Sequence, residues 1–323
     1  MAVAARWTRL LLQNAPCARS SHGLSTVKGR AYLFGGEATA RHAIDSALHR
    51  LEVTGEGTAA WTKLLLDHAP SPRVGHAQCA VDSRLILFGG RTDVDMGEGN
   101  LNDLWSFDTD AGKWTQLESD GAPSPRSFHR AAAVGDRVYI FGGCGAEGRL
   151  ADLYEYDMGR GVWSELPPPP GVTGRGGATL EPSFDGASLW LAGGFDGGET
   201  NELLRLCLRT QEWERHPSAW FRPRSVAASF SFDRAFMIFG GEVSPSDKGH
   251  EGAGGFAGDL VAIDPRSGEP LHLAIEDGSP TPPARGWGAS ASLSPSEGIL
   301  FGGLAGDDAS PVRLDDAWLL QVT

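Results

Sequence analysis

The chain has 323 residues, a formal net charge of −13 and 41% hydrophobic residues. An acidic chain of this kind repels nucleic acid and anionic membrane surfaces, so neither is expected as its main partner. Its 44 glycines and 20 prolines predict many short strands joined by turns, and no apolar run is long enough to cross a membrane.

A hydrophobic run that ends in two glycines occurs six times along the chain. The first glycines of these pairs are Gly35, Gly89, Gly142, Gly193, Gly240 and Gly302, so successive repeats are 54, 53, 51, 47 and 62 residues long. Short runs rich in aromatic and β-branched residues are typical of strands buried on both faces. Glycine ends such a strand where the chain turns sharply or where no side chain fits. A period of about 50 residues predicts the blades of a propeller.

Each repeat carries the same parts in the same order. An arginine is followed by a strand of small residues, a tight polar turn, the apolar strand with its Gly-Gly pair, a variable loop and an alternating strand such as 102–108. A last short strand opens with tryptophan in four repeats, at Trp61, Trp114, Trp163 and Trp213. These parts predict four antiparallel strands per blade, joined by short loops.

The sixth repeat ends at Thr323 without a fourth strand, and the N-terminus supplies a match. Trp7-Thr8-Arg9-Leu10 closely resembles the strand that opens at Trp61, 54 residues later. We therefore expect an all-β fold: one domain, residues 1–323, forming a six-bladed propeller whose ring is closed by Trp7–Leu10 in the last blade. This structural role is preferred over a transit peptide, although the chain is basic and free of acidic residues before Glu37.

The four cysteines are widely spaced and form no CxxC pair: they are Cys17, Cys79, Cys144 and Cys207. This spacing argues against a disulfide framework or a zinc site, and free thiols predict a reducing compartment. The expectation is a cytoplasmic monomer.

The arginine of each repeat begins the innermost strand, so the set is expected around the mouth of the central channel: Arg19, Arg73, Arg126, Arg175, Arg224 and Arg285. A cationic ring on an acidic protein focuses its field on an anion. Each arginine can also form hydrogen bonds with neighbouring loops, because its planar guanidinium carries several donors. The ligand-binding and the architectural interpretation both stay open. Three residues later, His22, His76 and His129 are expected to pack inside rather than to bind metal.

The longest loop follows the fifth Gly-Gly pair, over residues 242–256. It carries Glu242, Asp247 and His250, and two carboxylates with one histidine form a ligand set for Fe(II) and similar ions. Spacing alone favours a solvated polar loop with Glu242 paired to an arginine of the ring. Glu37 also follows a Gly-Gly pair, so glutamate at this position does not by itself indicate a metal.

The six apolar-Gly-Gly strands and the tryptophan-opened strands resemble the kelch family over nearly the whole chain. Within that family, the loop at 242–256 is similar to that of the plant nitrile-specifier, epithiospecifier and thiocyanate-forming proteins and their broader non-specifier relatives. Specifier proteins act on unstable aglucones from glucosinolate hydrolysis and depend on iron(II). Their iron motif is Glu-x3-Asp-x3-His. Glu242 and His250 match its outer positions, whereas Ser246 stands in the middle and Asp247 follows it.

The same resemblance implies a ligand site at the channel mouth, with Arg73 and Arg126 directed toward the anionic group of the ligand and Trp287 as the site residue from the last blade. Two functions are then compatible with the sequence. The first is a binding module, without catalytic residues, for a small anion or a protein partner at the arginine-lined mouth. The alternative is an Fe(II)-dependent, lyase-like specifier protein. Oxidase chemistry of the galactose oxidase kind is not expected, because the four tyrosines are not placed for its copper site.

Overall fold

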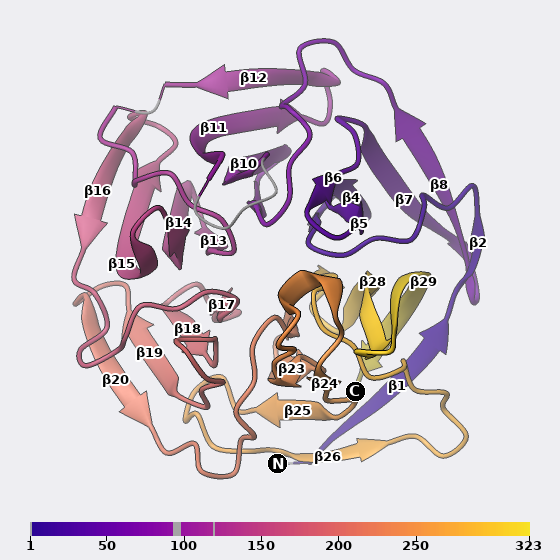
Figure 1. Cartoon of the computed structure of the whole chain (residues 1–323). Coiled ribbons are helices and arrows are strands. Elements are labelled where there is room, and N and C mark those ends of the chain that lie inside the picture. Colours follow the sequence, from indigo (N-terminus) through magenta and orange to yellow (C-terminus); the bar gives the residue numbers. More distant parts are fainter. Residues whose placement is uncertain (1, 93–97, 119) are drawn as a thin grey trace.

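The computed structural model describes residues 2–92, 98–118 and 120–323, with the backbone alone at His250. Figure 1 shows small sheets that stand like blades around a central channel, with the two chain ends close together at one blade. The predicted all-β, six-bladed propeller is confirmed. The described residues include one short helical turn, η1 (Gly249–Glu251), and no helix among them is long and apolar enough to cross a membrane.

The blades are numbered in chain order, and their strands run from the channel outward as follows. Blade one holds β3 (Gly23–Val27), β4 (Arg30–Phe34), β7 (Leu48–Gly55), β8 (Thr58–Leu64) and β2 (Leu11–Gln13). Blade two holds β9 (Ala77–Val81), β10 (Arg84–Arg91), β11 (Asn100–Asp108) and β12 (Lys113–Leu117). Blade three holds β13 (Arg130–Val134), β14 (Arg137–Gly145), β15 (Gly148–Asp157) and β16 (Val162–Leu166). Blade four holds β17 (Thr179–Pro182), β18 (Ser188–Ala192), β19 (Leu203–Cys207) and β20 (Glu212–His216).

The last two blades share the chain ends. Blade five holds β21 (Ala228–Ser231), β22 (Phe236–Phe239) and β25 (Leu260–Ile263). Blade six holds β27 (Ala289–Ser294), β28 (Glu297–Asp307), β29 (Ser310–Val322), β1 (Ala2–Arg9) and β26 (His272–Ile275). Two short hairpins follow the first and fifth Gly-Gly pairs: β5 (Glu37–Thr39) with β6 (His42–Ala43), and β23 (Glu242–Ser244) with β24 (Gly255–Phe256).

The N-terminal strand closes the ring, as predicted. β1 pairs antiparallel with β29, and Trp7 lies opposite Leu320. The strand is longer than expected, because it begins at Ala2 and its first residues also pair with β26. Residues 2–9 therefore form part of blade six.

Blade five differs from the four-strand expectation. The N–H of Leu271 bonds to the carbonyl of Ala262, but His272–Ile275 then leaves the blade and pairs in parallel with β1. The long β1 offers this segment a free edge, whereas the segment lacks the tryptophan that anchors the outer strand in other blades. The same crossing occurs at β2, which pairs in parallel with β8 and links blade six to blade one.

The Gly-Gly pairs join neighbouring blades. Both glycines of every pair have positive φ, which side chains disfavour. The second glycine donates its N–H to the carbonyl of the arginine in the next blade, as Gly241 does to Arg285 at 2.8 Å. A Cβ on the first glycine would meet that same carbonyl, at 2.5 Å for Gly240. The glycines are therefore needed both for the turn and for the close approach of the backbone of the next blade.

The hydrophobic core lies between the blades rather than at one centre. The buried apolar residues form six clusters, one at each boundary between adjacent blades. In four blades, the outer-strand tryptophan packs on the phenylalanine that precedes Gly-Gly in the preceding blade. Ring centroids are 5.0 Å apart for Trp61 with Phe301 and 5.2 Å for Trp7 with Phe239. Trp7 thus makes the same contact in the closing blade as its counterparts do elsewhere.

Candidate functional site

The repeated arginines lie buried inside the blades. In Arg73 all five N–H donors are used: Nε bonds to the Ser71 carbonyl, Nη1 to the Gly89 carbonyl and to Asp103, and Nη2 to Asp103 and the Ser71 hydroxyl. Arg126 uses its donors in the same pattern, and neither side chain lines the mouth cavity described below. These contacts favour the architectural interpretation, and ligand binding by these two residues stays a prediction.

The first blade breaks this pattern. Arg175, Arg224 and Arg285 also pair with a carboxylate of their own blade. In blade one the corresponding strand position holds Ala47, since Leu48 lies opposite Phe34 as Leu104 lies opposite Phe88. Arg19 bonds instead to the carbonyls of Gly35 and Cys17 and to the Cys17 sulfur, and burial lowers the pKa of its guanidinium.

A closed ring of backbone hydrogen bonds narrows the channel two residues after each arginine. Each N–H donates to the carbonyl of its neighbour at 2.6–3.0 Å around the ring of Ser21, Gly75, Phe128, Gly177, Val226 and Trp287. All six members have positive φ, which is strained for the β-branched Val226 at 46°. The hydrogen bonds hold this strained backbone, and they point the side chains of the larger members at the channel.

Phe128 and Trp287 come from blades three and six, on opposite sides of the ring. Their rings meet edge to face, with centroids 5.4 Å apart and an interplanar angle of 83°. Gly75 makes room for this contact, because a Cβ there would lie 2.7 Å from the Phe128 ring. We call the two rings the aromatic plug. Both line the cavity above the ring, and both also line a space of about 40 Å³ that His22, His76 and Arg130 border from below.

The mouth pocket is the cavity of about 400 Å³ above the plug. Its floor includes Phe128, Trp287 and Phe195, and its rim includes Arg41, Arg149, Lys248, Glu242 and Asp247. The rim residues come from the β5–β6 hairpin, the start of β15, and β23 with the loop after it, so the variable segments after Gly-Gly build the site. Figure 1 shows the β23–β24 hairpin on the inner side of the ring, toward its centre.

Three cationic side chains line this pocket. The guanidinium of Arg149 stacks on the Phe195 ring, 4.5 Å from its centroid, which holds the cation beside the aromatic floor. Arg41 and Lys248 line the same cavity. These three cations stand against the two lining carboxylates of Glu242 and Asp247, on a protein with a net charge of −13. The pocket is therefore a local reversal of the protein's charge.

Two carboxyl groups near the pocket have pKa values close to neutrality. Burial raises the pKa of Glu242 to about 7, against the effect of a hydrogen bond from the Ser246 N–H. Burial also raises the pKa of Glu199 to about 8, against a hydrogen bond from the Ser225 hydroxyl, and the nearby Glu242 adds to the rise. Groups that titrate near pH 7 suit proton transfer, so this part of the site can act as an acid or a base.

The predicted site residues are partly brought together. Trp287 lines the mouth pocket, and so do Glu242 and Asp247, so two predicted iron ligands share a cavity. The side chain of the third, His250, is outside the described residues, although its backbone lies in η1. Among the side chains that are described, no three of the types His, Cys, Asp and Glu lie close enough to hold a metal ion. The iron site stays a prediction.

Several pocket residues were missed from the sequence. Phe128 and Trp287 both stand two residues after an arginine, but only the tryptophan was singled out there. Phe195 directly follows a Gly-Gly pair, and Arg149 follows one by six residues. The signal was present, because each repeat places the residues after Gly-Gly on the mouth side. Arg41 and Lys248 lie in loops without a repeated pattern, and only the structure finds them.

Comparison with known proteins gives the same fold. The KLHDC2/KLHL20/DRC7 Kelch-repeats domain family matches residues 21–241. The chain belongs to this kelch family. The solved structure of YjhT superposes on the kelch chain with a TM-score of 0.72 and 19% identity, covering 97% of this chain and 99% of that one. At this identity the likeness shows the fold alone.

The relatives of this kelch chain differ in kind. The N-(sulfonatooxy)prop-2-enimidothioate sulfolyase of Thlaspi arvense is 28% identical over 319 residues, which cover 89% of this chain and 88% of the sulfolyase. The flagellar outer-arm dynein alpha chain of Chlamydomonas reinhardtii is 38% identical over 135 residues, or 41% of this chain and 3% of the dynein. Human host cell factor 2 is 34% identical over 144 residues, or 40% of this chain and 18% of that protein. The relationship to a plant sulfolyase thus extends over most of the chain.

Proposed function

We propose that this kelch protein binds a small organic anion in the mouth pocket, with a sulfate or carboxylate group attached to an apolar group. The proposal rests on one observation: Arg41, Arg149 and Lys248 surround a cavity with an aromatic floor, on an otherwise acidic protein. Local positive charge attracts an anion from solution, and the aromatic floor buries its apolar part.

The Thlaspi relative supports the same class of ligand. Its name describes a substrate that carries a sulfonatooxy group, which is an anion at neutral pH. A partner protein that presents a carboxylate would meet the same three cations. Competition with a small anion therefore separates the two: a partner that uses this pocket is displaced by methyl sulfate, and a partner that binds elsewhere is not.

The test is calorimetric titration with methyl sulfate. Removing one cation costs about 1 kcal/mol at an interface with water, so Arg149→Met and Lys248→Met should each weaken binding by roughly fivefold. Arg84→Met, an exposed arginine at the start of β10 outside the pocket, is the matched control and should bind as the wild type does. An unchanged affinity in the Arg149→Met/Lys248→Met double variant would reject the proposal.

The second candidate is a lyase of the specifier kind. It is supported by the sulfolyase relationship and by the two carboxylates, Glu242 and Asp247, that share the pocket. Glu242, Asp247 and His250 would hold iron(II), and the metal would supply a Lewis acid beside the bound anion. Glu199, which is not one of these metal ligands, would exchange protons with the ligand near neutral pH.

Metal binding decides this second candidate. Iron(II) is added to the protein without oxygen and uptake is measured for the wild type, Glu242→Gln and Asp247→Asn. Near-stoichiometric uptake that both variants weaken would support the lyase and justify assays with sulfate-bearing aglucones. Uptake that neither variant changes would reject the iron site and leave anion binding as the function.

A further inference from the structure

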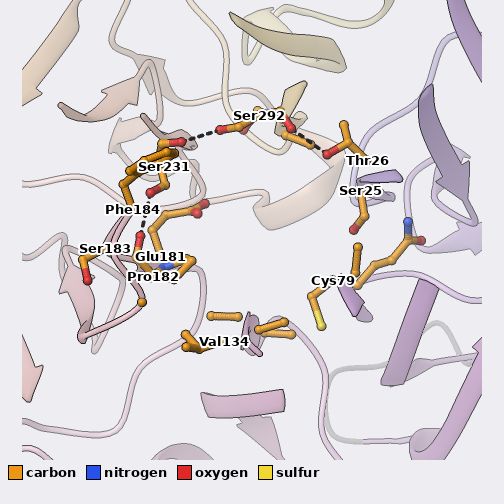
Figure 2. Close-up of a pocket in the computed structure, with 18 of the residues that line it drawn as sticks. Ser25, Thr26, Cys79, Val134, Glu181, Pro182, Ser183, Phe184, Ser231 and Ser292 are labelled. Atoms are coloured by element: carbon orange, nitrogen blue, oxygen red, sulfur yellow. Dashed lines mark hydrogen bonds between the residues drawn. The ribbon is translucent and has the colours of Figure 1, made fainter. Parts of the chain in front are cut away.

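The central channel contains a second cavity below the aromatic plug. A space of about 410 Å³ opens on the lower face and is lined by the inner strands of all six blades. A narrower chamber of about 70 Å³ shares Gln78, Ala131 and Glu181 with this space and adds Arg130, His22 and His76. We call the two together the lower channel, and Figure 2 shows its wider part.

The walls of the lower channel differ in chemistry. On one side hydroxyls bridge neighbouring blades: Thr26 donates to the Ser292 carbonyl at 2.6 Å, Ser292 to the Ser231 carbonyl at 2.9 Å, and Ser231 to the Pro182 carbonyl at 2.6 Å. Figure 2 shows these bonds along one side of the cavity. The other side is the apolar run 131–134. Because the hydroxyl protons are used within the wall, the polar side offers mainly lone pairs to a ligand.

Opposite charges line the chamber without forming an ion pair. Arg130 donates from Nε to the Ala178 carbonyl at 2.7 Å and from Nη2 to the Ala227 carbonyl at 3.3 Å. Three of its five N–H donors therefore have no acceptor among the described residues. Glu181 accepts from the Ser229 hydroxyl at 2.7 Å through one oxygen, and its other oxygen has no donor in the described part of the chain.

Buried polar atoms around the chamber also lack partners. His22 and His76 line the chamber and are only 7% and 6% exposed, and neither ring nitrogen of His76 has a hydrogen bond within the described structure. The Oε1 atom of Gln78 is buried and unpartnered in the same way. Burial lowers the pKa of both histidines to about 3, so each imidazole is neutral. Unpaired buried donors and acceptors are costly and indicate a site for a polar molecule.

We propose that the lower channel is a second binding site, for a small molecule with a primary carboxamide head. The carbonyl accepts from the free N–H groups of Arg130, and the amide protons go to Glu181 and Gln78. The aliphatic part of the ligand lies against the apolar side of the lower channel, residues 131–134. A neutral head is favoured because Arg130 and Glu181 balance each other, and a charged ligand would leave a net charge in a buried space. The wider part of the lower channel opens on the lower face, and the ligand enters there.

The experiment compares three probes of one shape: propionamide, propionate and propylammonium. Their affinities are measured by saturation-transfer NMR for the wild type, Arg130→Met and Glu181→Gln, with Arg84→Met as the control. Propionamide should bind saturably, roughly tenfold more tightly than the two charged probes. Arg130→Met should weaken propionamide by about tenfold or more, and Arg84→Met should not change it.

Glu181→Gln separates a binding role from a purely structural one. It removes the negative charge and leaves Arg130 uncompensated, so propionate should bind this variant roughly tenfold more tightly than it binds the wild type. A variant that merely disturbed the fold would lose affinity for every probe and gain none. The proposal is overturned if the wild type binds no propionamide, if it binds propionate equally well, or if Glu181→Gln leaves propionate binding unchanged.

Discussion

Replacing Trp7 with alanine tests how the ring is closed. Trp7 belongs to the N-terminal strand, yet its ring packs between Phe239, 5.2 Å away, and Phe230, 6.1 Å away, more than 200 residues later in the chain. It is 1% exposed, and its backbone N–H bonds to the Ser279 hydroxyl. The substitution therefore opens a cavity between blades five and six without touching the backbone pairing.

The expected loss follows from the buried area. A buried tryptophan removes about 150–250 Å² from water, which at about 25 cal/mol per Å² amounts to about 4–6 kcal/mol. Substitutions of this kind in other cores cost about 3–5 kcal/mol. Trp7 packs on the phenylalanine that is equivalent to the partners of the other outer-strand tryptophans. We therefore expect a loss of about 3–5 kcal/mol in the free energy of unfolding, rather than the small cost of a frayed terminus.

Urea unfolding followed by far-UV circular dichroism measures this loss. Trp61→Ala is the matched variant, because Trp61 makes the same contact with Phe301 between blades six and one. Equal losses in the two variants would show that the closing blade is as integral as the others. A loss below about 1 kcal/mol for Trp7→Ala, with the expected loss for Trp61→Ala, would refute closure by the N-terminal strand.

Three further predictions concern the ion pairs, the mouth pocket and the glycine pairs. Burial alone would raise the pKa of Asp316, but its hydrogen bonds and charge interaction with Arg285 outweigh this and lower it. The pair therefore stabilises the fold above the ordinary carboxyl pKa of about 3.9 and is lost as the pH falls below it. Asp316→Ala should cost about 3 kcal/mol at neutral pH in urea unfolding, because Arg285 is left buried and unpaired, and an equal cost at pH 2–3 would contradict this. Methyl sulfate should bind more tightly as the pH falls through about 7, because Glu242 becomes protonated in that range and the pocket thereby loses a negative charge. Protonation of Glu199, whose pKa is about 8, contributes at the upper end of this pH range. Glu242→Gln should therefore flatten the dependence of methyl sulfate affinity on pH below about 8. Gly240→Ala should cost roughly 2 kcal/mol or more, because φ is +67° and the new Cβ would lie 2.5 Å from a backbone carbonyl, and a neutral effect on the urea midpoint would refute the close-approach argument.

Much of the fold could be predicted because its signals are local and repeated. The Gly-Gly pairs and the tryptophan-opened strands mark strand ends and outer strands by their own chemistry, and their spacing counts the blades. The crossing of His272–Ile275 to β1 could not be predicted in this way. It depends on which sheet edge lies nearest once the ring is closed, and that edge belongs to the other end of the chain.

The candidate site was predicted less completely, and the arginines show why. Their place at the start of each innermost strand follows from the order of the strands, but whether they are free to bind a ligand depends on partners such as Asp103, 30 residues away from Arg73 on a different strand. A sequence shows that an arginine and an aspartate both recur. It does not show that the aspartate accepts two hydrogen bonds from the arginine, or that the arginine has no N–H donor left for a ligand. The same limit applied to Phe128, whose ring reaches Trp287 only because blades three and six face each other.

The amino-acid sequence by itself determined the all-β class, the number of blades and the strand that closes the ring, because each rests on a short pattern whose chemistry is the same wherever it occurs. Only the tertiary structure decided which polar groups are buried and paired, which two rings meet in the channel, and which loops share the mouth pocket. These properties depend on atoms from blades far apart in the chain. Burial and hydrogen bonding are set by the neighbours that the closed ring brings together.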